Sequence, residues 1–257
     1  MSIRAANVLS TPVLPIGAEE AASVIASWAA DGRGRAVCAA NVHMVMEAWD
    51  DTAFAALLEG ADLIVCDGRP LVWACRLQGV GGALHTRGSD LMEAVCSVAA
   101  QRGLRVGLYG GAPEVTETVR RVLLTRHHGL EESYCWSPPF RQLTDAEDAA
   151  AMAAIATAGV QILLVSLGCP KQERWMIAHR DQMTCVMLGV GAAFDMLAGR
   201  IPTAPKAMQR VGLEWAFRLV YEPRRLWRRY AKHNARFVAL LLRSELRSRF
   251  ARVGQRD

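Results

Sequence analysis

Short apolar runs alternate with helical patterns along most of the chain, and this alternation restricts its fold more than any other feature. After the first run, RAVCA, the apolar residues take up a helical period over residues 42–49, and a similar change follows the later runs. Strands that alternate with helices usually pair in parallel, with helices on both faces of the sheet. The sequence therefore predicts an α/β protein with a mostly parallel sheet, whose strands are Arg35–Ala39, Asp62–Cys66, Arg105–Tyr109, Gln161–Leu167 and Thr184–Leu188.

The length and composition allow one large hydrophobic core and at most a small second unit. The chain has 257 residues, of which 52% are apolar, and a chain of this size can bury a single α/β core. Two prolines in the segment RIPTAPK interrupt any helix there, and the composition turns basic beyond them. We therefore expect an α/β core over residues 1–200 and a basic helical C-terminal appendage over residues 201–257, with a break in its helices at Glu222 and Pro223.

Positive charge is concentrated in this appendage. From residue 200 onward there are fifteen Lys and Arg against four Asp and Glu, although the whole chain has a net charge of only +5. Arg218, Arg225 and Arg228 recur at spacings that would place them along one helix face if the helix continued through Pro223, among Trp and Tyr side chains. A solvated amphipathic helix would have this pattern, and so would a helix that lies on an anionic membrane surface. Because no helix-turn-helix, RRM or KH pattern accompanies the charge, we predict no nucleic-acid partner.

Polar residues and glycines follow the predicted strands at their carboxyl ends, where a parallel sheet binds its ligands. Two glycine turns, YGGAP and GVGAAF, each connect a strand to a helix, and such turns either hold a diphosphate or satisfy packing. Asp67 directly follows the run DLIVC, so it is either a helix cap, which its spacing favours, or a functional carboxylate. Asn41 and Asp195 have the same two interpretations. The candidates at this edge are Asn41, Asp67, Gly110, Gly111, Gln172, Gly189, Gly191 and Asp195.

Patterns that bind metal ions are missing from the sequence. There is no Asp-x-Asp, no cluster of His, Cys and carboxylates at ligand spacing, and no Cys-x-x-Cys among the seven cysteines. The six histidines are dispersed, and we interpret His43, His85 and His179 as surface or packing residues. We therefore expect no metal site and reduced, buried thiols.

The sequence also lacks membrane-spanning and export signals. No segment reaches the roughly 18 consecutive apolar residues that a spanning helix needs. The N-terminal segment has no continuous apolar stretch of the kind that a signal peptide contains. We therefore expect a cytoplasmic protein.

An ordered set of motifs is more specific than any of these patterns. The chain resembles the WecG/TagA/CpsF glycosyltransferases from roughly Ile16 to Arg229. The resemblance rests on NVHMVMEA, ADLIVCDGRPLV, RGSDLM, GLYGGAPEV, LLVSLGCPKQERW, LGVGAAFDMLAGRI and RVGLEWAFRLVYEPRRLWRRY, in that order.

The resemblance implies a Rossmann-like core and an inverting, metal-independent transfer that needs no cofactor. The donor would be a UDP-sugar and the acceptor a sugar linked to undecaprenyl diphosphate, at the inner face of the cell membrane. Similarity places a general base at Asp67, with Asn41 and Arg87 near the acceptor and the phosphates, and matches Gln172 to a polar motif residue. The arginines that would close over UDP are Arg218, Arg225 and Arg228.

The donor sugar and the oligomeric state stay open. Many members have Thr two residues before the motif asparagine, where this chain has Ala39. Loss of that hydroxyl puts in doubt a sugar contact there, so N-acetylmannosamine, its uronic acid and glucose all stay candidates. A homo-oligomer is compatible with the resemblance.

Two other functions fit part of the sequence. A nicotinamide-dependent dehydrogenase would use the same glycine turns, but it needs a complete G-x-G-x-x-G and an acidic residue for the ribose, and neither is visible. A non-catalytic membrane-binding protein would explain the basic appendage alone. It predicts that a UDP-sugar is never consumed.

Overall fold

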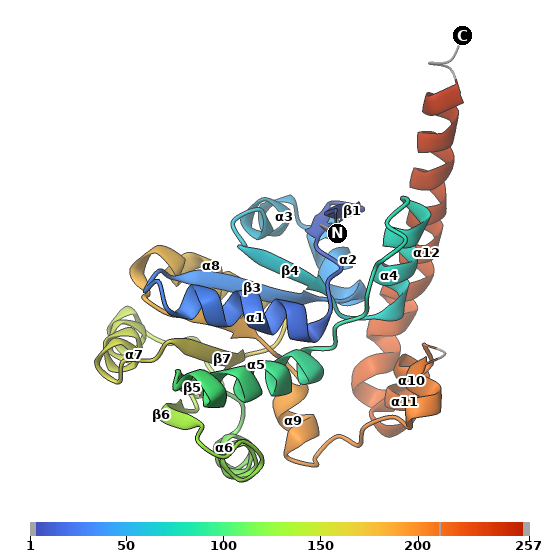
Figure 1. Ribbon diagram of the computed structural model, residues 1–257. Coiled ribbons are helices and arrows are strands. Elements are labelled where there is room, and N and C mark those ends of the chain that lie inside the picture. Colours follow the sequence, from blue (N-terminus) through green and yellow to red (C-terminus); the bar gives the residue numbers. More distant parts are fainter. Residues whose placement is uncertain (1–3, 211, 254–257) are drawn as a thin grey trace.

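A six-stranded parallel sheet forms the centre of the molecule (Figure 1), as the alternation of runs predicts. The computed structural model describes residues 4–210 and 212–253, and the side chains of residues 210, 225, 229 and 245–253 lie outside this description. The strand order is β4-β3-β8-β7-β5-β6. The strands are β3 (Arg35–Ala40), β4 (Leu63–Cys66), β5 (Arg105–Gly110), β6 (Glu131–Trp136), β7 (Ile162–Ser166) and β8 (Val186–Gly189).

Three strands were not predicted from the sequence. The edge strand β6 is EESYCW, whose side chains are exposed or half-buried, so it lacks the apolar run that marks the inner strands. The antiparallel pair β1 (Ala6–Val8) and β2 (Thr11–Val13) has only three residues per strand, too few for a recognisable alternation.

Helices cover both faces of the sheet, because successive side chains of each strand point to opposite faces. Val37 belongs to one buried apolar cluster and its neighbour Cys38 to the other. The Val37 cluster includes α1 (Ala18–Ala29), α5 (Gly88–Arg102), α6 (Pro113–Arg126) and α9 (Ala193–Leu197). The Cys38 cluster includes α2 (Val42–Asp50), α3 (Thr52–Leu58), α4 (Arg69–Leu77), α7 (Asp145–Thr157) and α8 (Lys171–His179).

The C-terminal segment is helical, as predicted, and comprises α10 (Lys206–Arg210), α11 (Glu214–Tyr221) and α12 (Pro223–Val253). The break between α11 and α12 falls at Glu222, the predicted position. Phe237 and Leu241 of α12 are buried and belong to the Cys38 cluster, so this helix packs on the core through α2. Figure 1 shows its last turns extending beyond the sheet. Within residues 4–210 and 212–253, no helix combines the length and apolarity needed to cross a bilayer.

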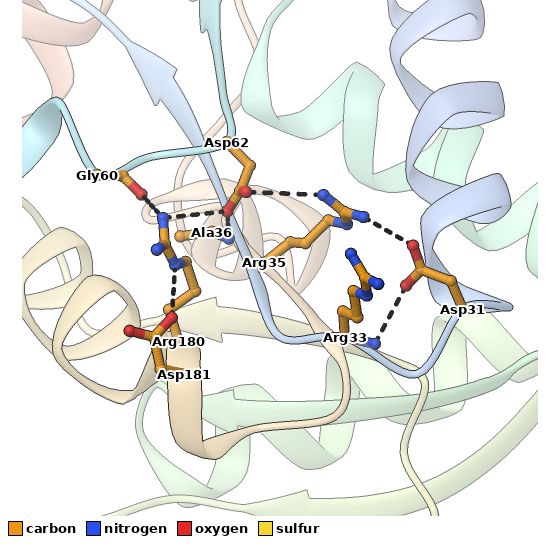
Figure 2. A network of polar contacts seen from close by, with 8 residues as sticks. All are labelled: Asp31, Arg33, Arg35, Ala36, Gly60, Asp62, Arg180 and Asp181. Atoms are coloured by element: carbon orange, nitrogen blue, oxygen red, sulfur yellow. Dashed lines mark hydrogen bonds and ion pairs between the residues drawn. The ribbon is translucent and has the colours of Figure 1, made fainter.

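A charged network fastens the amino-terminal ends of β3 and β4 (Figure 2). Asp62 accepts a hydrogen bond from the backbone N–H of Ala36 at 2.8 Å and lies 3.8 Å from Arg35 and 4.0 Å from Arg180. Arg35 also pairs with Asp31 at 2.7 Å, and Arg180 belongs to the short 3-10 helix Arg180–Gln182. The network therefore fixes the end of these strands opposite to the one where a ligand is expected.

Candidate functional site

A pocket of about 230 Å³ lies at the carboxyl ends of β3, β4, β7 and β8. This is the edge of the sheet where the sequence predicts ligand binding, and the helices that follow the neighbouring strands β3 and β8, α2 and α9, lie on opposite faces of the sheet. The C-terminal helices supply a second wall, which includes Glu214 and Arg218 of α11 and Tyr230 of α12. The sheet and the C-terminal helices thus build the pocket together.

Most of the predicted site residues meet in this pocket. Its lining includes Asn41, Asp67, Arg87, Gln172, Gly189, Gly191 and Arg218. Gly110, Gly111, Asp195 and Arg228 are not part of the lining. Arg225 belongs to α12, but its side chain lies outside the described residues.

Asp67 presents its carboxylate to the pocket. Its backbone N–H donates to the carbonyl of Ala40 at 2.6 Å, which holds it directly after the end of β4. Helix α4 is instead capped by Gly68, whose φ of 129° favours glycine, and no side chain bonds to the free N–H groups there. The capping interpretation is therefore wrong for Asp67. The side chain is 31% exposed, and its Oδ1 lies 3.8 Å from Nε2 of His85.

Asn41 is a helix cap as well as a pocket residue. Its Oδ1 accepts hydrogen bonds from the N–H groups of His43 at 3.0 Å and Met44 at 3.2 Å, which satisfies two donors at the start of α2. These bonds fix the Asn41 side chain at the carboxyl end of β3, beside Asp67 at the end of β4.

Charges of both signs face one another in the pocket. Arg87 donates two hydrogen bonds to Asp90, at 2.7 and 2.8 Å. Burial raises the pKa of the Glu214 carboxyl, and the negative charge of Asp67 raises it further, whereas Arg87 and Arg218 oppose the shift. The pocket lining therefore combines three carboxyl groups with three guanidinium groups, which suits a ligand that has both phosphate and hydroxyl groups; they belong to Asp67, Glu173 and Glu214, and to Arg69, Arg87 and Arg218.

Gln172 fixes the turn that follows β7. Its Oε1 accepts from the N–H of Gly168 at 3.2 Å, and its Nε2 donates to Oε1 of Glu173 at 2.8 Å. Burial raises the pKa of the Glu173 carboxyl. A Cβ added to Gly189 would lie 3.0 Å from Nε2 of Gln172, so the glycine leaves room for this side chain.

The first glycine turn is explained by packing. A Cβ added to Gly110 would lie 2.4 Å from the carbonyl oxygen of Ser166, and one on Gly111 would lie 2.9 Å from Oγ1 of Thr116.

Two other predicted site residues lie outside the pocket lining. Arg228 is exposed, and its guanidinium lies over the ring of Trp227 at 5.5 Å. Asp195 lies inside the short helix α9, and its carbonyl accepts from the backbone of Arg200.

The family model of the Glycosyl transferase WecG/TagA/CpsF family matches residues 6–251, nearly the whole chain. The chain belongs to this family. As a WecG/TagA/CpsF glycosyltransferase it transfers a sugar from a donor to an acceptor, and the pocket at the end of its sheet is the candidate site for both. Its Rossmann-like fold agrees with the resemblance found in the sequence.

Sequence reasoning missed several pocket residues of this glycosyltransferase. His43, His85 and His233 line the pocket, and so does Glu214. The interpretation of His43 and His85 as surface or packing residues did not predict this position. No spacing indicates His233, because it lies some 190 residues from His43 and comes beside it only through the docking of α12. The packing interpretation is confirmed for His179, which bonds to the Trp175 carbonyl and pairs with Asp148 at 2.8 Å.

Proposed function

We propose that this glycosyltransferase is an inverting enzyme of cell-surface polysaccharide synthesis. It moves a sugar from a UDP-sugar to an acceptor linked to undecaprenyl diphosphate, and the candidate sugars are N-acetylmannosamine, its uronic acid and glucose. The observation that carries the proposal is the Asp67 carboxylate, which is partly exposed and not used as a helix cap, in a pocket that also contains Arg87 and Arg218.

Asp67 acts as the general base in this proposal. It takes the proton of the acceptor hydroxyl as that oxygen attacks the anomeric carbon of the donor sugar. The bond from this carbon to the UDP oxygen breaks on the opposite face, and UDP leaves with the bonding electrons. Configuration at the carbon is inverted because attack and departure occur on opposite faces.

Arginines neutralise the charge that develops on UDP. Arg218 reaches the pocket from α11, where it also pairs with Glu222 at 3.5 Å, and Arg87 reaches it from the start of α5. Fixed cations placed where charge develops stabilise a transition state strongly. The absence of Asp-x-Asp from the sequence supports a transfer in which these arginines, and not a divalent ion, meet the diphosphate.

The C-terminal helices are proposed to bring the enzyme to the lipid-linked acceptor. Trp215, Tyr221 and Trp227 are exposed, and they lie in the most basic part of the chain. Aromatic rings and cations together favour adsorption to an anionic membrane surface. The enzyme would then act at the inner face of the cell membrane as a peripheral protein.

A panel of UDP-sugars, each with and without a lipid-linked acceptor, tests this function. The expected result is UDP release that depends on the acceptor and on one of the three candidate sugars. If no UDP-sugar is consumed and NADH binds instead, the dehydrogenase interpretation replaces this proposal. If nothing is consumed and the protein only binds vesicles, the non-catalytic interpretation replaces it.

A further inference from the structure

Helices α2 and α12 bring two histidines and a glutamate together at the wall of the pocket. His43 and Glu47 lie one turn apart on α2, and Nδ1 of His43 is 3.6 Å from Oε1 of Glu47. Nε2 of His233, on α12, is 3.4 Å from the same oxygen. One ligand atom from each of the three residues lies within 4.8 Å of one from each of the other two, and His233 is only 3% exposed. The cluster thus joins two segments that are far apart in the sequence.

We propose that these three side chains bind one zinc-like transition-metal ion. Two imidazole nitrogens and one carboxylate oxygen are a ligand set that Zn²⁺ takes in proteins, with a fourth position left for water. Bonds of 2.0–2.1 Å in a tetrahedral site place neighbouring ligand atoms about 3.3 Å apart. The separations of 3.4 and 3.6 Å from the Glu47 oxygen are therefore already close to those around a bound ion. Because both histidines line the pocket, water can reach the fourth position from there.

The neighbouring charges favour a cation at Glu47. Lys232 and Arg236 are the basic side chains of α12 nearest to this cluster in sequence, and both are held by Asp50, one turn further along α2. The distances are 3.6 Å for Lys232 and 2.7 Å for the shorter contact of Arg236. Among the described side chains, Asp50 thus pairs with both Lys232 and Arg236, while Glu47 faces the two imidazoles.

The ion would fasten α12 to the core at the position where this helix forms the pocket wall. Tyr230, His233 and Asn234 of α12 line the pocket, and Phe237 packs below them in the core. No step of the proposed sugar transfer passes through the ion. Zinc binding can therefore be tested, and can fail, independently of the transferase activity.

Calorimetric titration of Zn²⁺ into metal-stripped full-length protein tests the site, and Co²⁺ absorption in the visible reports its geometry. The experiment uses a Cys135→Ser background, because Cys135 is an exposed thiol that could bind zinc itself. We expect one ion per chain and a Co²⁺ spectrum typical of four-coordinate sites.

Glu47→Gln and His233→Asn should each weaken Zn²⁺ binding by at least about 100-fold, since even residues behind the ligands often contribute 10- to 100-fold. His127→Gln is the matched control. Its imidazole pairs with Glu93 at 2.8 Å, and the described residues place no third ligand there. If His233→Asn does not fold, Glu47→Gln decides, because it preserves size at a partly exposed position. Absence of stoichiometric binding, or equal binding by Glu47→Gln, would overturn the site and leave only a polar contact between two helices.

Discussion

Arg236 of α12 donates two hydrogen bonds to the carboxylate of Asp50 on α2, at 2.7 and 2.9 Å. These bonds lower the pKa of Asp50 from its ordinary value of 3.8 to about 2. The pair connects the C-terminal helix to the helix that begins at Asn41 in the pocket. The titration of Asp50 therefore reports on the strength of the contact between α12 and α2.

The ion pair between Asp50 and Arg236 makes the free energy of unfolding depend on pH. Because the pKa of Asp50 is lower in the folded protein, its contribution is complete above about pH 4 and is lost as the pH falls toward 2. Asp50→Asn should lower the free energy of unfolding at pH 7 by about 0.2–1 kcal/mol, as expected for a partly exposed ion pair. The loss should become smaller as the pH falls toward 2. Urea unfolding from pH 2 to 7 with EDTA present measures both effects, and Asp181→Asn is the exposed control. A loss that stays constant down to pH 2 would contradict the assignment.

The glycine turn after β5 is predicted to be structural. A methyl group on Gly110 would meet the Ser166 carbonyl at 2.4 Å, and φ is 110° there. Gly110→Ala should therefore cost more than Gly199→Ala, which also has a positive φ but meets open space. The control should cost about 1–2 kcal/mol for its left-handed backbone alone. Thermal unfolding of the two variants gives the comparison. Equal Tm values would contradict the prediction, because they would show that β5 and β7 can move apart at Gly110 without a loss of stability.

The inner strands and the residues that follow them could be predicted, whereas the second wall of the pocket could not. The runs ending before Asn41 and Asp67 are apolar on both faces, as buried parallel strands must be, and their carboxyl ends meet by geometry. Glu214 and His233 carry no such signal. His233 reaches the pocket because α12 packs on the core through Phe237, and α11, which carries Glu214, packs against α12. A helical period in the sequence indicates an apolar helix face but not the element that this face contacts.

Two arginines of the appendage are predicted to have separate roles. Arg218 lines the pocket and Arg228 is exposed outside it. Arg218→Gln should reduce transfer to a soluble acceptor by roughly 10²–10³-fold, the usual loss when a donor to developing charge is removed. Arg228→Gln should leave that rate unchanged but weaken binding to anionic vesicles by about 1 kcal/mol, or about fivefold.

Vesicle sedimentation at low salt measures the second effect, and raising the salt should diminish it. Arg121→Gln, on the exposed side of α6, serves as the control for both assays. Loss of transfer in Arg228→Gln with the soluble acceptor would show that the outer arginine also acts in the pocket.

The transfer rate of Asp67→Asn tests the central claim most directly. The amide preserves the shape of a residue whose backbone is fixed by the Ala40 carbonyl, so the fold and UDP affinity should not change. With the cognate UDP-sugar and a soluble acceptor, kcat should fall by about 10²–10⁴-fold, because the base that takes the hydroxyl proton is gone. Asp181→Asn should transfer at the wild-type rate. Transfer by Asp67→Asn at that same rate would contradict the assignment of Asp67 as the base.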